Sequence, residues 1–250
     1  MVEVEKPAVS TGEVLVKIKY VGFCGSDLNT FAGRNPMVKL PVIPGHEVGA
    51  IIEEVGPGVP AELKKGMNVT LNPYTNCGKC ASCRSGRVNA CEHNETLGVQ
   101  RNGVMCEYAV LPWSKIIPAG DITPRDCALI EPMSVGFHAV SRGQITDNEY
   151  VMVIGCGMIG IGAIVRAALR GAKVIAVDLD NEKLELAKRC LDFLCRQEIA
   201  CHLNLHRLRS FQPEGHCIIT VYFRRHNGYT SPKSLLRPQC SLSLIHISEP

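Results

Sequence analysis

The sequence lacks the features that would direct a protein into or across a membrane. None of its apolar runs approaches the roughly 20 residues of a membrane-spanning helix. The N-terminus, MVEVEKPAVSTGEV, has no apolar core behind a basic start, so it does not resemble a secretory signal peptide. Both absences favour the cytoplasm, where disulfides rarely persist and clustered cysteines more often bind metal or take part in chemistry.

An excess of one charge is also missing from most of the chain. The formal net charge is only +3, which argues against a nucleic-acid partner. Residues 1–190 hold 20 basic and 20 acidic side chains, so the excess lies in residues 191–250, with five of the eight histidines. The stretch CRQEIACHLNLHRLRSFQPEGHC there has no sustained helical or strand period. We interpret residues 191–250 as an aberrant tail, frame-shifted or disordered, rather than a polar extension or a His/Cys metal-binding tract.

No internal repeat is present, and the pattern before residue 191 changes once. Up to about residue 148, segments such as EVLVKIKYVGF and VGAIIEEV alternate in hydrophobicity between Pro and Gly residues, as in a barrel-like or sandwich domain. From residue 149, a buried strand, a glycine turn, an apolar helix and a second buried strand follow. This βαβ unit predicts an α/β protein: a β-rich domain over residues 1–148, then the start of a parallel sheet over residues 149–190.

The glycine turn of the βαβ unit has a pattern typical of dinucleotide-binding proteins. Small residues there let the backbone approach a pyrophosphate, whose charge then lies at the helix N-terminus. A plain turn that binds nothing is the alternative, because the pattern G-x-G-x-x-G is weak outside this strand–turn–helix context. We expect the dinucleotide to contact Gly155, Gly157, Met158, Ile159 and Gly160.

An acidic residue follows at the end of the second strand of this unit. Asp178 lies 23 residues after Gly155, where its carboxylate would accept hydrogen bonds from the adenosine ribose. The same carboxylate would repel a 2′-phosphate, and Leu179, Asp180 and Asn181 offer no cation to bind one. The sequence therefore predicts NAD rather than NADP.

Four cysteines lie within fifteen residues, in the pattern Cys77-x2-Cys80-x2-Cys83-x7-Cys91. Disulfides, a redox pair, an iron–sulfur cluster and a zinc site all use closely spaced cysteines. A bacterial ferredoxin run places three residues before its fourth cysteine and a proline after it, whereas here the gap is seven and Glu92 follows. A cytoplasmic location argues against disulfides, and no thioredoxin-like unit surrounds these residues to support a redox pair.

A second set of metal-binding side chains lies earlier in the chain. Cys24, His46 and Glu47 offer a thiolate, an imidazole and a carboxylate, which zinc accepts in sites that keep one position open. Taken singly, Cys24 is also compatible with a small buried apolar residue, and His46 with a core histidine. The adjacent His-Glu pair after a turn favours the metal.

Taken in order, CGSDL, GHE, the four-cysteine segment, EPMSVGFHA and the glycine pattern resemble the zinc-containing medium-chain alcohol/polyol dehydrogenase family. Within that family the sequence resembles the sorbitol-type and threonine-type enzymes, and the resemblance covers residues 1 to about 190. It implies a GroES-like catalytic domain followed by a Rossmann doubly wound parallel sheet. It also implies hydride transfer from a secondary alcohol (a polyol, sugar alcohol or sugar acid) to NAD, in a cytoplasmic protein that is a homo-oligomer at full length. A threonine-type amino-alcohol dehydrogenase and a non-catalytic zinc-stabilised binding module are the alternatives.

The resemblance assigns roles to individual residues. It implies a structural zinc ion at the four cysteines and a catalytic zinc ion bound by Cys24 and His46. Glu47 is a ligand of the catalytic zinc or a neighbouring carboxylate that swings in. Glu131, in EPMSVGFHA, stands where polyol dehydrogenases have glutamate and alcohol dehydrogenases a third cysteine ligand, which points to a polyol-like or hydroxy-acid substrate. The hydroxyl of Ser26 takes the proton of the substrate.

The sequence also departs from the family pattern. Asn29 stands where many members place the histidine that ends the proton relay, so the route beyond Ser26 stays open. Trp113 and His138 are assigned to packing rather than to the substrate pocket. Nothing after Cys190 resembles the remainder of the dinucleotide sheet, so we expect the chain as written to be truncated and inactive.

Overall fold

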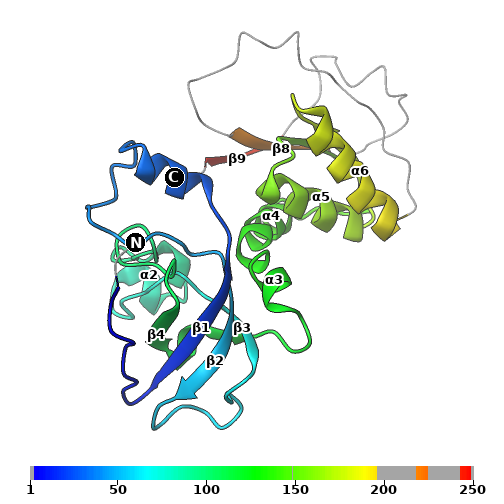
Figure 1. Ribbon diagram of the computed structural model, residues 1–250. Helices are drawn as coiled ribbons and strands as arrows, with labels where there is room; N and C mark the ends of the chain where they lie inside the picture. The colour runs from blue at the N-terminus through cyan, green and yellow to red at the C-terminus, as the bar shows by residue number, and fades with distance from the viewer. Residues whose placement is uncertain (1–2, 148, 196–217, 225–242, 249–250) are drawn as a thin grey trace. The chain divides into compact units, whose positions relative to one another are not determined.

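The computed structural model describes residues 3–147, 149–195, 218–224 and 243–248 (Figure 1). Within these ranges, no helix combines the length and apolar character that a membrane crossing needs. The chain divides into two compact units, Met1–Glu131 and the part from Pro132 onward. The division falls at Glu131, whereas the sequence suggested a boundary after residue 148; the domain limits stay a prediction.

The first unit is built on a five-stranded antiparallel sheet. In space, the strands follow the order β4-β1-β2-β3-β5. The predicted strands in EVLVKIKYVGF and VGAIIEEV are confirmed as the central pair, β1 and β2. The bounds are β1 Glu13–Val21, β2 Val48–Val55, β3 Asn68–Leu71, β4 Tyr108–Pro112 and β5 Ile116–Pro118.

The core of the first unit lies against this sheet. Fully buried valine and isoleucine side chains dominate it, as expected for strands whose apolar residues face inward. The members that are completely buried are Val14, Val16, Val48, Ala50, Ile52 and Val69. Short helical segments lie between and after the strands: α1 Gly25–Phe31, α2 Ala81–Arg84, η1 Val88–Ala90, η2 Trp113–Lys115 and α3 Pro124–Cys127.

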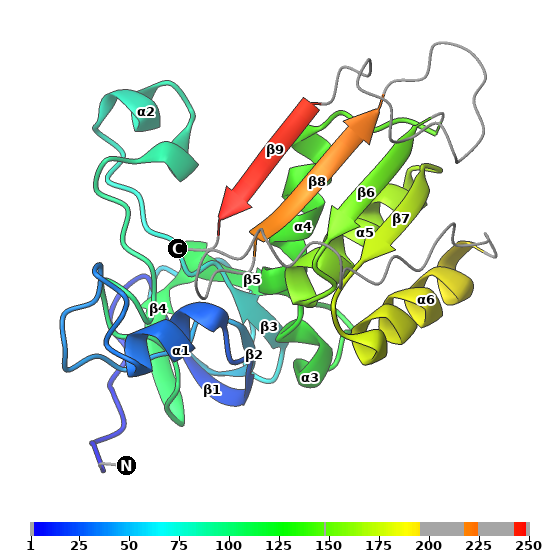
Figure 2. The ribbon, with the colours of Figure 1, turned by 90° about the horizontal axis from the view of Figure 1, so that it is seen from above.

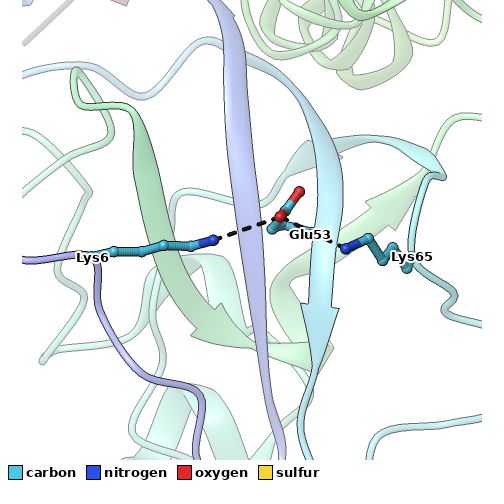
Figure 3. Close-up of polar contacts among 3 residues, drawn as sticks. All are labelled: Lys6, Glu53 and Lys65. Atoms are coloured by element: carbon cyan, nitrogen blue, oxygen red, sulfur yellow. Dashed lines mark ion pairs between the residues drawn. The ribbon is translucent and has the colours of Figure 1, made fainter.

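Glu53 on β2 forms the ion pairs of this unit that Figure 3 shows. Its Oε1 lies 3.5 Å from Nζ of Lys6 and 3.7 Å from Nζ of Lys65. The Lys6 side chain is half-exposed and that of Lys65 largely exposed, and such surface pairs contribute only about 0–1 kcal/mol each. Lys6 also lies 4.3 Å from the ring centroid of Tyr108 on β4. Through these contacts, Lys6 links the segment before β1 to both β2 and β4.

The second unit contains the predicted βαβ unit. β6 (Tyr150–Ile154), α5 (Met158–Leu169) and β7 (Lys173–Val177) follow one another, and β6 pairs with β7 in parallel. Helix α5 is almost wholly apolar and nearly all of it is buried, as a helix that covers a parallel sheet must be. Helix α6 (Asn181–Cys195) packs against α5.

Helix α4 (Ile130–Arg142) explains why the second unit begins before residue 149. A Cβ atom added at Gly136 would lie 2.3 Å from the carbonyl oxygen of Ile159, so the backbones of α4 and α5 approach closely at this glycine. Figures 1 and 2 both show α4 and α5 on one face of the sheet of this unit. The motif EPMSVGFHA thus forms a helix that is largely part of the second unit.

Two strands lie in the segment for which the sequence predicted an aberrant tail. The sheet of the second unit has the order β7-β6-β8-β9, in which β8 (Ile218–Arg224) and β9 (Ser243–Ser248) are antiparallel to their neighbours (Figure 2). Among the described strands, β6 and β7 alone form the expected parallel pair. β8 adds an antiparallel strand to the free edge of β6, which would otherwise leave its N–H and C=O groups unpaired. The stretch between α6 and β8 lies outside the described residues, and the assignment of residues 191–250 as frame-shifted stays a prediction.

Candidate metal centres and dinucleotide site

The structure brings the four clustered cysteines together. Their sulfur atoms all lie within 4.8 Å of one another, and Cys80 and Cys91 are buried. The described cysteines form no disulfide. Cys80 caps α2, and its sulfur accepts a hydrogen bond from the N–H of Cys83. The sulfur of Cys91 accepts from the N–H groups of Cys77 and His93, at 3.3 Å each.

Backbone N–H groups lower the pKa of two of these thiols, Cys77 and Cys80, whereas the pKa of Cys83 is raised. The N–H groups of Cys83 and Glu92 lower the pKa of Cys80 to about 6. Hydrogen bonds from the N–H groups of Lys79 and Cys80 also lower the pKa of Cys77. Desolvation, helped by the neighbouring Cys80, raises the pKa of Cys83 to about 12. A cluster of four thiols that cannot all ionise alone fits a divalent cation, which deprotonates its thiol ligands on binding.

The second predicted set is also assembled. Cys24 lies at the N-terminus of α1, and His46 and Glu47 directly precede β2; one donor atom of each lies within 4.8 Å of those of the other two. His46 and Glu47 are buried, with 6% and 8% of their surface exposed. Nδ1 of His46 is buried and has no hydrogen-bond partner among the described residues. A buried polar atom without a partner is costly, so a metal ion at this mixed cluster fits the residues present.

A buried aspartate holds the two halves of this cluster together. Oδ2 of Asp27 accepts a hydrogen bond from the N–H of Cys24 at 3.0 Å, and Oδ1 accepts from the N–H of Gly45 at 3.3 Å. Asp27 thus joins the backbone of one candidate ligand to the residue before His46, and it is only 3% exposed. Sequence reasoning missed this role, although Cys24-x-x-Asp27 has the spacing of a capping box.

Glu131 lies near the cluster but is bound to another residue. Its Oε1 accepts a hydrogen bond of 2.8 Å from the hydroxyl of Tyr74. Burial raises the pKa of the Tyr74 phenol, the negative charge of Glu131 raises it further, and Cys24 and Glu47 act in the same direction. All three acidic groups therefore lie close to the Tyr74 hydroxyl. Tyr74 was not predicted, because it is separated from Glu131 by 57 residues and no sequence pattern links them.

The remaining predicted residues of the first unit have different environments. Ser26 is buried in α1, close in sequence to Cys24, and Asn29 is half-buried in the same helix. Trp113 is 42% exposed, and His138, in the second unit, is also exposed. The assignment of Trp113 and His138 to packing stays a prediction.

The glycine turn in the second unit has the geometry that a dinucleotide site requires. Gly155 has a φ of +95°, a left-handed conformation that favours glycine, and Gly157 caps α5. A Cβ atom added at Gly160 would lie 1.9 Å from the carbonyl oxygen of Gly155, whereas one at Gly157 would meet nothing within 4 Å. Gly160 therefore permits the close packing of the turn, and Gly157 leaves open space at the N-terminus of α5.

Asp178 is tied directly to this turn. Its Oδ2 accepts a hydrogen bond of 2.6 Å from the N–H of Cys156, and its Oδ1 accepts one of 2.9 Å from the N–H of Asp180. Cys156 is buried, and desolvation together with the charge of Asp178 raises its pKa to about 11. The other two residues predicted at this site differ: Met158 is 40% exposed, and Ile159 is buried in the core.

Comparisons with known proteins agree with this architecture. Residues 10–121 match the family model of the alcohol dehydrogenase GroES-like domain. The chain is 40% identical over 181 residues to L-galactonate-5-dehydrogenase of Escherichia coli K12, which covers 72% of this chain and 53% of that protein. The chain spans about half the length of the relatives that it matches.

Solved structures show the same similarity. Galactitol-1-phosphate dehydrogenase from Escherichia coli matches with a TM-score of 0.70 and 37% identity, over 76% of this chain and 55% of that one. A protein of Escherichia coli CFT073 described as a short chain alcohol dehydrogenase, solved with NADH, matches with a TM-score of 0.69 and 35% identity, over 76% and 56% of the two chains.

Proposed function

Because residues 1 to about 190 of this chain belong to the zinc-containing alcohol and polyol dehydrogenases, we propose that the protein oxidises a secondary alcohol and transfers its hydride to NAD. The observation that carries the proposal is the cluster of Cys24, His46 and Glu47, in which a buried nitrogen of His46 has no partner among the described residues. The relatives named above act on sugar acids and phosphorylated sugar alcohols, which supports a polyhydroxylated substrate.

The residues in and around the cluster of Cys24, His46 and Glu47 would have separate roles in catalysis. Cys24, His46 and Glu47 would hold the catalytic zinc, which when bound supplies a Lewis acid for the substrate oxygen. Ser26 would relay the hydroxyl proton of the substrate, since its Oγ accepts that proton while its own hydroxyl proton passes to a further acceptor. Glu131 would add a negative charge beside the site and favour a substrate with further hydroxyl groups.

The cofactor would bind in the second unit. The open space at Gly157 admits the pyrophosphate to the N-terminus of α5, and Asp178 would accept hydrogen bonds from the ribose. No cationic side chain follows Asp178 in the next three positions, so NAD is favoured over NADP. One of the similar solved structures contains NADH.

The four-cysteine cluster would hold a second, structural zinc ion. It offers four sulfur donors, which close a tetrahedral site and leave no position for a substrate. An enzyme with both sites binds about two zinc ions per chain, and a zinc-stabilised binding module binds about one.

Metal analysis of the purified chain tests this proposal. We expect about two zinc ions per chain in the unmodified protein and about one in Cys24→Ser, which should still fold. Cys106→Ser, a matched change of a cysteine outside both clusters, should keep both ions. A full zinc content in Cys24→Ser would contradict the catalytic site, and iron with sulfide would contradict the structural one.

We further propose a cytoplasmic protein, homo-oligomeric at full length, that binds a small alcohol and neither nucleic acid nor membrane. The cysteine usage supports the cytoplasm, and the near-neutral charge of residues 1–190 argues against nucleic acid. The family resemblance supports the homo-oligomer. A threonine-type substrate is the alternative within the family, and a comparison of polyol and amino-alcohol oxidation by a full-length relative of this chain would separate the two.

A further inference from the structure

The candidate catalytic metal site has four potential protein ligands, one more than a zinc ion with an open position can use. Cys24, His46, Glu47 and Glu131 are four donors, and four protein ligands would close a tetrahedral zinc site. A catalytic zinc ion needs one position for the substrate, so one of these donors must stay outside. The cluster of mutually close donor atoms comprises Cys24, His46 and Glu47, without Glu131.

Tyr74 makes the contact that distinguishes Glu131 from the other three. The phenol hydroxyl donates a hydrogen bond of 2.8 Å to Oε1 of Glu131, and this carboxylate is only 8% exposed. A hydrogen bond from a neutral donor to a buried carboxylate is among the stronger ones, because the charge has little water to stabilise it. Loss of this bond would leave Oε1 of Glu131 without the Tyr74 donor.

The folded chain holds Tyr74 firmly in place. Its N–H donates to Oδ1 of Asn72 at 3.1 Å, and the residue pairs with Thr96 across an isolated β-bridge. The next residue, Thr75, donates its N–H to the carbonyl of Glu95 at 3.0 Å. The backbone of Tyr74 is therefore held between β3 and the four-cysteine segment, and the hydrogen bond to Glu131 orients its hydroxyl.

We propose that Tyr74 is a positioning residue that keeps Glu131 out of the ligand set of the catalytic metal and so preserves its open position. This inference rests on the proposed function, since it requires a metal ion at Cys24, His46 and Glu47. Removal of the hydroxyl should release Glu131 to become a fourth ligand, which closes the site to external ligands and tightens metal binding.

Cobalt substitution and azide binding test the proposal without any measurement of turnover. Azide binds an open cobalt site and changes its visible absorption, whereas a closed site of four sulfur ligands does not respond. We expect the unmodified chain to bind azide. Tyr74→Phe should bind azide at least about tenfold more weakly and should bind cobalt at this site about tenfold more tightly. These factors correspond to the free energy of one charge-assisted hydrogen bond, which no longer holds Glu131 away from the metal. The double variant Tyr74→Phe/Glu131→Gln should recover azide binding.

Matched variants separate this role from a general loss of structure. Tyr20→Phe changes another half-exposed tyrosine of the same unit and should leave azide and cobalt binding as in the unmodified chain. Glu131→Gln alone should keep the visible absorption spectrum of the bound cobalt and its response to azide, because a residue outside the ligand set does not change the coordination of the metal; a changed cobalt spectrum without azide would show that Glu131 ligates and would overturn the proposal, even if Tyr74→Phe fails to fold.

The outcomes also separate the inference from the proposed function. If cobalt responds to azide equally in Tyr74→Phe and in the unmodified chain, Tyr74 has no positioning role, although the metal site stands. If no azide-sensitive cobalt site exists in the unmodified chain, or if Cys24→Ser does not abolish it, the proposed function and the inference fail together.

Discussion

Replacement of Asp27 tests how the fold assembles the catalytic cluster. Its carboxylate accepts hydrogen bonds from the N–H groups of Cys24 and Gly45 and is almost fully buried. A hydrogen bond to a charged group contributes about 1.5–3 kcal/mol, and the bond to Gly45 is long at 3.3 Å. We therefore expect Asp27→Ala to lower the free energy of unfolding of the first unit by about 3–4 kcal/mol. Asp27→Asn keeps one acceptor oxygen and should lose about 1.5–3 kcal/mol.

The only tryptophan of the chain makes this measurement specific. Trp113 lies in the same unit as Asp27, so its fluorescence during denaturant unfolding reports on that unit alone. Asp121→Asn is the control, since Asp121 is an exposed aspartate of the same unit, and it should change stability by less than about 0.5 kcal/mol. Zinc affinity should fall along with stability, because the Cys24 backbone is no longer held to the segment before His46. A stability of Asp27→Ala equal to that of the control would refute the reasoning.

Three further predictions concern the other sites. Cys80→Ser should remove one zinc ion per chain and lower the denaturant midpoint of Trp113 fluorescence, since a structural metal contributes folding free energy, whereas Cys106→Ser should leave both unchanged. Gly160→Ala should disrupt the second unit, because its methyl group would collide with the backbone of the turn. Gly157→Ala should keep the circular dichroism of the unmodified chain and weaken only NAD binding, measured by calorimetric titration. Equal behaviour of the two variants would contradict the assigned geometry. Asp178→Ala should weaken NAD binding without producing strong NADP binding, since the variant also loses the hydrogen bond that holds the turn; an unchanged NAD affinity would count against both roles of Asp178.

Local patterns in the sequence were enough to predict the elements that carry the sites. Alternation of apolar and polar residues predicted β1 and β2, and the strand–glycine turn–helix pattern predicted β6, α5 and β7. The pattern of the four cysteines belonged to the family resemblance that implied a common zinc site, and closely spaced ligands on a short loop reach one point through local backbone geometry. Periodicity and spacing are properties of residues close together in the sequence, so they can be recognised without knowledge of the fold.

The tertiary structure alone decided the contacts between distant segments. Tyr74 and Glu131 lie 57 residues apart, and neither a period nor a motif relates a tyrosine after β3 to a glutamate at the start of α4. The second hydrogen bond of Asp27, to Gly45, likewise depends on how the chain returns to β2. The antiparallel addition of β8 to β6 follows from the need of an edge strand for a partner, which the sequence of β6 cannot specify. The sequence thus determined which chemical groups the protein carries, and the packing of the chain decided which of them touch.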